Sequence, residues 1–321
     1  MPELGPILRN AKVYIAGHRG LVGSAIWRLL KKEGFTRLIG KTSSELDLRD
    51  PVAVEQFFQD ENPEYVFLAA AKVGGIVANN TYPADFISDN LRIQVNVIDS
   101  ARRNAVRRLL FLGSSCIYPK FAEQPMREDA LMTGALEPTN DAYAVAKIAG
   151  ILQIQANRRQ YGSSFISAMP TNLYGPGDNF DLQNSHVLPA LMRKIHEAKE
   201  KNTKYVEVWG DGTPYREFLH VDDLASASLF LLENYDGNEP LNVGVGYDLS
   251  IRDLVQKVKT IIGYRGEIVY DTTKPNGTPR KLLDSTKLQK LGWLAEITLE
   301  RGIEDTYHWY LSKLEEPSLN V

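Results

Sequence analysis

Three polar side chains with the chemistry of a carbonyl or carbinol redox site occur in the middle of the sequence. Ser114 follows the apolar run 110–112, and Tyr143 and Lys147 come about thirty residues later, four positions apart. That spacing places the last two on one face of a helix. A tyrosine near its ordinary pKa of about 10 is a poor acid or base at neutral pH, but a neighbouring ammonium favours the phenolate. A serine that reaches the same substrate oxygen can donate a second hydrogen bond. The pattern predicts chemistry at a carbonyl or hydroxyl carbon.

A glycine motif near the N-terminus lies between an apolar run and a helical pattern. Residues 17–23 read Gly-His-Arg-Gly-Leu-Val-Gly, a GxxGxxG spacing. In this context the glycines permit a tight turn, close approach of a pyrophosphate and packing of the helix on the strand. The helix N-terminus offers N–H groups to the anion. An ordinary glycine turn would also fit the spacing alone. The context predicts dinucleotide binding by Gly17, His18, Arg19, Gly20, Leu21, Val22 and Gly23.

The stretch after the second predicted strand indicates which dinucleotide binds. An acidic residue about twenty positions past the glycine loop would hold an adenosine ribose 2′-hydroxyl, but residues 38–44 read Leu-Ile-Gly-Lys-Thr-Ser-Ser. Lys41, the adjacent hydroxyls and Arg19 suit a 2′-phosphate instead. The sequence therefore favours NADP over NAD, and solvated surface cations are the alternative interpretation of Arg19 and Lys41.

The elements that must position these groups alternate between short apolar runs and helical patterns, which is typical of βαβ units and a parallel sheet. We predict a Rossmann-like, doubly wound α/β fold. Asp50 is expected to cap the helix that Pro51 opens. Strands are expected at residues 12–16, 37–40, 65–71, 108–112, 165–169 and 241–243, and helices at 21–33, 51–59, 87–104, 141–161 and 222–233.

The local composition of the sequence changes after Pro170, where turn residues become frequent and the spacing of the predicted elements becomes irregular. We expect a smaller, discontinuous second domain packed over the carboxyl ends of the sheet, where doubly wound folds bind ligands. The dinucleotide-binding domain is expected to span residues 1–172 plus about 218–246. The substrate-binding domain is expected to span about 173–217 plus 247–321.

The composition excludes several functional classes. The 37 Lys and Arg against 40 Asp and Glu give a formal charge of −3, which argues against a nucleic-acid or membrane-surface role. One cysteine rules out an intramolecular disulfide, and the five histidines lack ligand spacing, so no metal is expected. Residues 1–12 lack a signal-peptide core, and no apolar run approaches the ~18 residues of a membrane span. We therefore expect a cytoplasmic protein.

The order of the motifs resembles the extended short-chain dehydrogenase/reductases, which act largely on nucleotide sugars. Further segments are similar to the GDP-L-fucose synthases of that family, and together they cover almost the whole chain. They are Gly17-His-Arg-Gly-Leu-Val-Gly-Ser, Ala70-Ala-Lys-Val-Gly-Gly-Ile, Asn79-Asn-Thr-Tyr-Pro-Ala-Asp-Phe, Gly113-Ser-Ser-Cys-Ile-Tyr-Pro-Lys, Pro170-Thr-Asn-Leu-Tyr-Gly-Pro, Arg216-Glu-Phe-Leu-His-Val-Asp-Asp and Lys274-Pro-Asn-Gly-Thr-Pro-Arg-Lys.

The resemblance implies a bifunctional enzyme that converts GDP-4-keto-6-deoxy-D-mannose to GDP-L-fucose, by epimerisation at C3 and C5 and NADPH-dependent reduction at C4. Ser114, Tyr143 and Lys147 would serve the reduction, and Cys116 and His186 would be the base and acid of epimerisation. Taken alone, Cys116 would more often be a small buried hydrophobe, and His186 a surface or capping residue. Their places in the matching motifs assign them to catalysis. A homodimer is also implied.

The resemblance further maps ligand contacts onto the chain. Substrate contacts fall on Lys194, Trp209 and Arg216, where Arg suits bidentate phosphate recognition and Lys a point charge. The alternatives are core packing for Trp209 and a surface ion pair for Arg216. Asn276 replaces the aspartate that the family commonly has, which puts a carboxylate contact in doubt and predicts weaker or altered substrate affinity. Cofactor contacts beyond the glycine loop and Lys41 fall on Lys147, Pro170, Thr171, Asn172, Leu173 and His186.

Two other functions fit parts of the pattern. A related nucleotide-sugar 4-epimerase or dehydratase would recycle its cofactor and usually hold NAD tightly. The missing acidic residue after the second predicted strand argues against it. A non-catalytic, cofactor-binding relative would have no need of an intact set of Ser114, Tyr143 and Lys147.

Overall fold

A computed structural model describes residues 4–182, 185–274 and 276–315 of the chain. Its main sheet has six parallel strands in the order β2-β1-β3-β4-β5-β10. The chain passes from β1 to β2 on one side and returns to β3 on the other, so the β1/β3 crevice is the switch point where doubly wound folds bind ligands. The predicted fold class is confirmed. The strands are β1 Lys12–Ala16, β2 Arg37–Ile39, β3 Tyr65–Leu68, β4 Arg108–Leu112, β5 Ser164–Pro170 and β10 Leu241–Val243.

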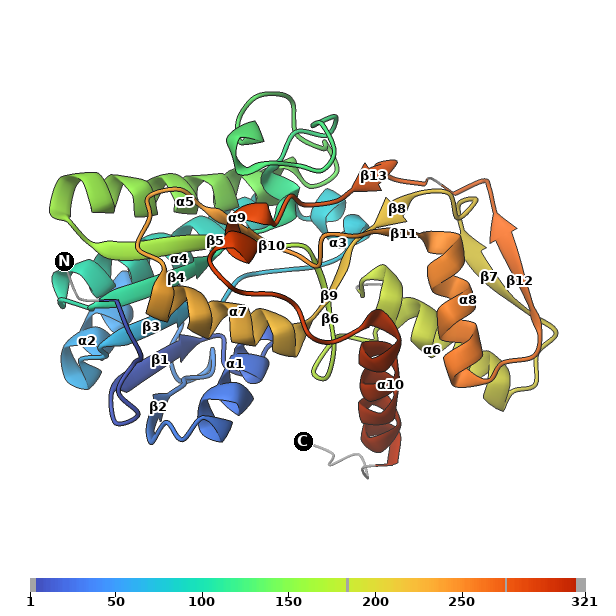
Figure 1. Ribbon diagram of the computed structural model, residues 1–321, viewed down its shortest axis with the longest axis horizontal. Helices are drawn as coiled ribbons and strands as arrows, with labels where there is room; N and C mark the ends of the chain where they lie inside the picture. The colour runs from blue at the N-terminus through green and yellow to red at the C-terminus, as the bar shows by residue number, and fades with distance from the viewer. Residues whose placement is uncertain (1–3, 183–184, 275, 316–321) are drawn as a thin grey trace.

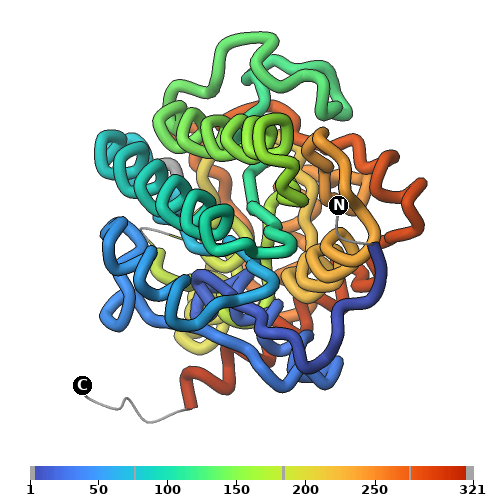
Figure 2. Tube along the Cα trace, turned by 90° about the vertical axis from the view of Figure 1, so that its left-hand side faces the viewer, coloured from blue at the N-terminus to red at the C-terminus, as the bar shows by residue number. Residues whose placement is uncertain are grey.

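Helices cover both faces of this sheet (Figures 1 and 2). Alternating side chains of β1 show the layers, since Val13 and Ile15 join one hydrophobic core and Tyr14 joins the other. Because both faces are buried, the strands are apolar on both sides. The first core contains α1 (Leu21–Lys32) and α7 (Val221–Asn234), and the second contains α2 (Pro51–Glu61), α4 (Pro83–Arg103) and α5 (Asp141–Tyr161).

Most predicted boundaries agree with the structure. The strands 108–112 and 241–243 and the helix 141–161 coincide with β4, β10 and α5. Asp50 caps α2 by accepting the N–H groups of Val52 and Ala53. The helix expected from residue 87 begins at Pro83, since proline fits the first helical position. The strand expected to reach residue 71 ends at Leu68, because the next three residues form a loop along a cavity.

A second lobe stands beside the sheet domain, at the right of Figure 1. It has its own hydrophobic core, to which Leu191, Val258 and Ile303 belong. Its helices are α6 (Val187–Glu200), α8 (Ile251–Ile262) and α10 (Leu299–Glu315). Its strands are the parallel pair β7 (Tyr205–Trp209) and β12 (Glu267–Asp271), and β8 (Tyr215–Arg216) between β11 (Leu249–Ser250) and β13 (Arg280–Lys281).

Short elements connect the two lobes. β6 (Asn172–Tyr174) continues from β5 and pairs in parallel with β9 (Phe218–His220), which leads into α7. The remaining short elements are α3 (Ile76–Thr81), α9 (Thr286–Lys290) and the 3-10 helices η1 (Ser115–Ile117) and η2 (Glu128–Ala130). In the part of the chain that the structure describes, no helix is long and apolar enough to cross a membrane.

Candidate active site

A cavity of about 1890 Å³ lies between the carboxyl edge of the main sheet and the second lobe. The loops that follow β1 to β5 form one wall, and residues of α6, β7 and β8 contribute the other. The structure brings every sequence-predicted site residue to this one cavity. These residues are Gly17, His18, Arg19, Gly20, Leu21, Val22, Gly23, Lys41, Ser114, Cys116, Tyr143, Lys147, Pro170, Thr171, Asn172, Leu173, His186, Lys194, Trp209, Arg216 and Asn276.

The glycine loop packs too tightly for side chains at two of its positions. Gly17 has φ +83°, and a Cβ there would lie 2.8 Å from the backbone nitrogen of Ala70. A Cβ on Gly23 would lie 2.1 Å from the carbonyl oxygen of Gly17. The helix that follows has no side-chain cap and no acidic residue in its first turn. Its N-terminus is therefore open to an anion, and the loop fits the pyrophosphate of a dinucleotide.

Cations and hydroxyls gather where the loops after β1 and β2 meet. Arg19, Lys41, Thr42 and the two serines that follow it line this end of the cavity. Within the described ranges, neither Arg19 nor Lys41 forms an ion pair with a carboxylate of the chain. His18 is held against the ring of Trp27 at a centroid distance of 5.5 Å. The composition of this end fits a phosphate monoester such as the 2′-phosphate of NADP.

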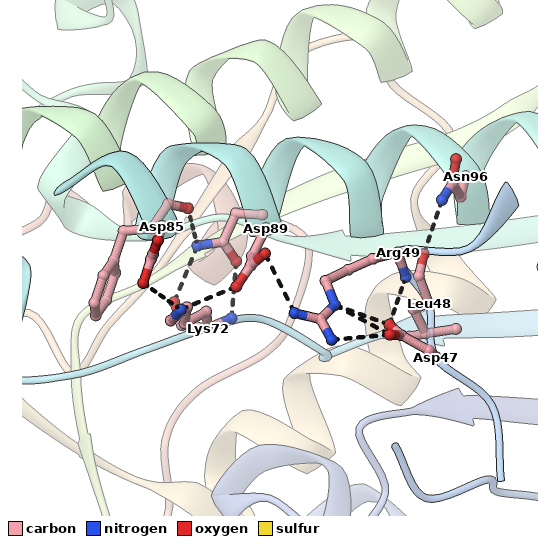
Figure 3. A network of polar contacts seen from close by, with 9 residues as sticks. Asp47, Leu48, Arg49, Lys72, Asp85, Asp89 and Asn96 are labelled. Carbon is pink, nitrogen blue, oxygen red and sulfur yellow. Dashed lines mark hydrogen bonds and ion pairs between the residues drawn. The ribbon is translucent and has the colours of Figure 1, made fainter. Parts of the chain in front are cut away.

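A polar network fastens the loops after β2 and β3 to α4 (Figure 3). Lys72 Nζ lies 2.9 Å from a carboxylate oxygen of Asp89, and Arg49 reaches the same carboxylate at 3.5 Å while pairing with Asp47 at 2.8 Å. The buried Asn90 accepts the N–H of Lys72 and donates to its carbonyl. Lys72, Arg49 and Asp47 all line the cavity. The network therefore fixes the wall opposite the second lobe.

Ser114, Tyr143 and Lys147 meet at the carboxyl end of β4. Ser114 caps η1 by accepting the N–H of Cys116 at 3.3 Å, and its hydroxyl hydrogen-bonds the phenol of Tyr143. Lys147, one helical turn after Tyr143, is 4% exposed. Its Nζ donates to the carbonyl of Leu112 at 2.8 Å and lies 5.8 Å from the centre of the Tyr143 ring. The four-residue spacing thus places both side chains beside Ser114.

The protonation of this group differs from the expectation that the ammonium favours a phenolate. Burial and the nearby Cys116 raise the pKa of Tyr143, and the hydrogen bond with Ser114 opposes them only in part. Burial also lowers the pKa of Lys147 to about 8. Lys147 donates its hydrogen bond to the carbonyl of Leu112 rather than to the phenol. The effect of burial on the pKa of Tyr143 therefore outweighs the effect of the ammonium. Tyr143 is therefore a neutral phenol at neutral pH and suited to give a proton.

Cys116 and His186 reach the cavity from the two lobes. Cys116 lies in η1, half-buried, and interacts electrostatically with both Tyr143 and Arg216. His186 precedes the first residue of α6. The surrounding cavity walls lower the pKa of His186 by desolvation, so its imidazole is neutral at neutral pH. No cluster of three His, Cys, Asp or Glu side chains able to hold a metal occurs among the described residues.

The second-lobe wall carries an exposed indole and a guanidinium that forms no ion pair with any carboxylate of the described residues. Trp209 is 55% exposed, which excludes the core-packing interpretation, and Nζ atoms of Lys194 and Lys274 lie 5.6 and 5.7 Å from its ring centre. Arg216 donates to the carbonyl of Tyr215 at 2.7 Å, and burial lowers its pKa. No ion pair of Arg216 is found in the described segments, so the surface ion-pair alternative does not hold. A half-buried cation whose charge is not balanced by a nearby carboxylate of the described segments favours an anionic ligand.

Comparison with known proteins assigns the family. Residues 13–244 match the NAD dependent epimerase/dehydratase family. GDP-L-fucose synthase 1 of Arabidopsis thaliana is 60% identical over 306 residues, covering 95% of this chain and 95% of its own length. The GDP-L-fucose synthase of Escherichia coli (strain K12) is 56% identical over 95% of this chain and 98% of its own length. The chain belongs to the GDP-L-fucose synthase family.

Solved structures agree with this assignment. A GDP-L-fucose synthetase from Naegleria fowleri bound to NADP has a TM-score of 0.90 with this chain at 29% identity, and the match covers 98% of each chain. The fold shared with this solved enzyme therefore extends over both lobes.

Asn276 occupies the position where the sequence resemblance leads us to expect an aspartate. Its Oδ1 accepts the N–H of Asp211 at 2.9 Å, and its side chain also hydrogen-bonds the Asp211 carboxylate. It thereby holds the turn that follows Trp209. An aspartate at 276 would face the carboxylate of Asp211. Asn276 lines the cavity as expected, but its bonds in this structure are to that turn.

Some polar residues of this cavity were not indicated by the sequence. Lys120 and Glu137 form an ion pair of 3.1 Å, and both line the cavity that contains Cys116. Lys120 ends one of the matching motifs, but Glu137 comes from an irregular segment without periodicity. Only contacts in the folded structure indicate a role for Glu137, since Thr278 of the second lobe donates a hydrogen bond to the same carboxylate.

Proposed function

We propose that this protein converts GDP-4-keto-6-deoxy-D-mannose to GDP-L-fucose, as an NADPH-dependent 3,5-epimerase and 4-reductase. The observation that carries the proposal is the joint placement of a neutral phenol, a hydrogen-bonded serine and a thiol beside a guanidinium that has no carboxylate partner among the described residues. Tyr143, Ser114, Cys116 and Arg216 all line one cavity. The first three are groups for chemistry next to a ketone, and the fourth is a group for a diphosphate.

NADPH is the cofactor that the dinucleotide end of the cavity fits. The open N-terminus of α1 and the glycine loop would hold the pyrophosphate, and Arg19 with Lys41 would hold the 2′-phosphate. Lys147 and the loop 170–173 would lie along the nicotinamide ribose and ring. When bound, NADPH supplies the hydride that reduces C4 of the sugar.

Epimerisation requires proton removal and return at C3 and C5, both of which flank the C4 ketone. Ser114 and Tyr143 would donate hydrogen bonds to the C4 oxygen, which stabilises the negative charge that develops when a neighbouring proton leaves. The thiolate form of Cys116 would take that proton and become the thiol, and the imidazolium form of His186 would return one to the opposite face and become the neutral imidazole. The neutral state of His186 near pH 7 means that its donor form increases as the pH falls.

The reduction would use the same oxygen contacts in a second way. Tyr143 stays protonated because burial raises its pKa, and it can give that proton to the C4 oxygen as the ketone becomes an alcohol. The buried ammonium of Lys147 would stabilise the tyrosinate left behind at a distance of one helical turn.

The second lobe would hold the nucleotide part of the substrate. Arg216 and Lys194 would bind the diphosphate, Trp209 offers a surface for guanine, and Asn276 would support the turn that carries Trp209. We propose that residues about 173–217 plus 247–321 act as this substrate-binding domain, beside a cofactor-binding domain of residues 1–172 plus about 218–246.

The proposal is tested by incubation with GDP-4-keto-6-deoxy-D-mannose and NADPH in deuterated water. GDP-L-fucose that carries deuterium at C3 and C5, with one NADPH consumed per product, is the expected result. Turnover without net NADPH consumption would indicate a cofactor-recycling 4-epimerase or dehydratase instead. NADPH binding without any turnover of the 4-keto sugar would indicate a non-catalytic relative.

We further propose a cytoplasmic homodimer. Supporting the dimer, α4 and α5 lie side by side and present exposed apolar side chains at Val95, Val145 and Leu152. Consumption of NADPH and a single free thiol at Cys116 support a reducing compartment. Sedimentation equilibrium at micromolar concentration should give twice the chain mass, and a monomer would contradict the dimer. Fractionation of cells should recover the enzyme with cytoplasmic markers, and recovery with membranes would contradict this location.

A further inference from the structure

Glu217 is a fully buried carboxylate between the two halves of the site. It has no measurable exposure, and it follows Arg216 directly in an extended segment between β8 and β9. Its Oε1 accepts the N–H groups of Val245 and Gly246 at 2.7 and 2.9 Å. Its Oε2 accepts the N–H of Leu283 at 3.0 Å. One side chain thus joins the segment after β10 to the segment after β13.

The partners of the Glu217 carboxylate are backbone N–H groups and the side chain of Thr171 rather than cations. In the described parts of the chain no Lys, Arg or His pairs with this carboxylate. Burial raises the pKa of Glu217, while the N–H groups of Leu283, Gly246 and Val245 act in the opposite direction. A carboxylate that only uncharged donors stabilise is costly to keep in a core, so a simple packing role does not explain it.

The backbone of the same residue holds the cofactor-facing loop. The carbonyl of Glu217 accepts from Asn172 Nδ2 at 2.8 Å and from Thr171 Oγ1 at 3.4 Å. Asn172 is also the register partner of Phe218 in the β6/β9 pair. The loop proposed to lie along the nicotinamide is therefore tied to the residue next to Arg216.

Successive side chains of an extended segment point to opposite sides. Arg216 lines the cavity, and Glu217 accordingly points into the protein, where its three acceptor bonds fix the backbone from which Arg216 projects. The space for this arrangement comes from Gly244, where a Cβ would lie 2.3 Å from Oε1 of Glu217. Gly244 does not have a positive φ, so the need for glycine there is one of space.

We propose that Glu217 is a positioning residue, which sets Arg216 against the cofactor-facing loop and so determines the affinity of the enzyme for the diphosphate of its substrate. This inference rests on the proposed function, because it takes Arg216 as the diphosphate ligand. Glu217 touches neither substrate nor cofactor in this assignment and acts only through Arg216 and the loop 170–173.

The test measures GDP binding by calorimetry in Glu217→Gln, with NADP⁺ binding measured separately. Glutamine keeps the shape but turns an amide N–H₂ toward the N–H of Leu283. We expect GDP affinity about 10-fold lower and the KM of the GDP-sugar raised by a similar factor, with kcat within about 3-fold of wild type. The matched control is Asp223→Asn. Asp223 is 4% exposed and accepts the N–H groups of Glu296 and Ile297, but it lies outside the cavity.

The control separates positioning from general stability. Asp223→Asn should lower the melting temperature about as much as Glu217→Gln while leaving GDP affinity within twofold. Equal losses of GDP affinity in the two variants would overturn the inference. So would unchanged GDP affinity in a folded Glu217→Gln protein. Failure of the wild-type enzyme to bind GDP would instead refute the proposed function.

Two further variants keep the test decisive if Glu217→Gln folds poorly. Gly244→Ala presses on Oε1 without changing charge and should weaken GDP binding in the same direction. A double-mutant cycle with Arg216→Lys isolates the coupling. If Glu217 acts through Arg216, adding Gly244→Ala to Arg216→Lys should lower GDP affinity by less than a further twofold. Fully additive losses of GDP affinity in the double variant would overturn the inference.

Discussion

Replacing Lys147 by methionine should stabilise the ligand-free protein at neutral pH. The ammonium is 4% exposed, and burial lowers its pKa from 10.5 to about 8. At about 1.36 kcal/mol per pKa unit, this difference corresponds to roughly 3 kcal/mol of destabilisation while the group is charged in both the folded and unfolded states. The substitution also removes the hydrogen bond from Nζ to the carbonyl of Leu112, and this loss destabilises the variant by about 1 kcal/mol. The net gain expected for Lys147→Met at pH 7 is therefore about 2 kcal/mol.

The stability gain of Lys147→Met over wild type should decrease as the pH rises. The unfolded chain keeps this proton up to the ordinary pKa of 10.5, whereas the folded protein releases it above about 8. The wild-type protein therefore gains stability as the pH rises between these two values. The advantage of Lys147→Met should be complete well below pH 8, shrink through this window to zero at pH ~9.5, and become a deficit of about 1 kcal/mol by pH 10.5, because only the lost hydrogen bond then remains.

Urea unfolding of both proteins at pH 7, 8.5 and 10, followed by tryptophan fluorescence, measures this difference directly. Lys201→Met is the control, since the Lys201 side chain is 69% exposed and its removal should change stability by less than about 0.5 kcal/mol. A Lys147→Met protein less stable than wild type at pH 7, or a stability difference that is constant from pH 7 to 10, would refute this cost of burying the ammonium. A stabilised but inactive enzyme would show that the buried charge serves function at the expense of stability.

The other predictions concern individual steps. Tyr143→Phe should reduce NADPH oxidation by about 100-fold or more while solvent exchange at C3 and C5 persists; parallel loss of both would refute separate roles. Cys116→Ser should stop deuterium uptake at both carbons with NADPH binding intact, and unchanged uptake would remove Cys116 as the base. Arg19→Ala should weaken NADPH binding about 10-fold and NADH binding less than twofold, whereas equal losses would show that no 2′-phosphate contact exists. Contrary to the expectation that asparagine weakens substrate binding, Asn276→Asp, which faces Asp211, should raise the KM of the GDP-sugar about threefold at low salt and less at high salt; a KM independent of the substitution would exclude this repulsion.

Regular elements could be predicted where the signals are local. The helix α5 has the expected bounds because Asp141 lies in its first turn and Gly162, with φ +68°, ends it. The cap at Asp50 is equally local. The end of β3 could not be predicted, because the apolar run continues to residue 71 while the backbone leaves the sheet to approach Gly17.

The protonation of the candidate site and its partners could not be predicted in the same way. The lowered pKa expected for Tyr143 depends on distance and solvent, and burial reversed it. The bonds of Asn276 to Asp211 join segments that are far apart in sequence. That Arg216 has no carboxylate partner among the described residues likewise depends on which distant segments surround it. The anchoring of Glu217 to Leu283 is of the same kind, since the two residues are 66 positions apart. Residue type and spacing indicate which groups meet, but not their charge states.

The late position of α7 in the chain has a consequence for synthesis on the ribosome. The inner side of α1, with Ile26 and Leu30, packs in one core with Leu224 and Leu231 of α7. The N-terminal segment is bound to the same helix, since Ile7 donates its N–H to Glu233. The first helix made therefore has an uncovered apolar side until α7 has left the exit tunnel. During that interval a nascent chain exposes this side to chaperones and to neighbouring chains, and any product truncated before α7 exposes it permanently.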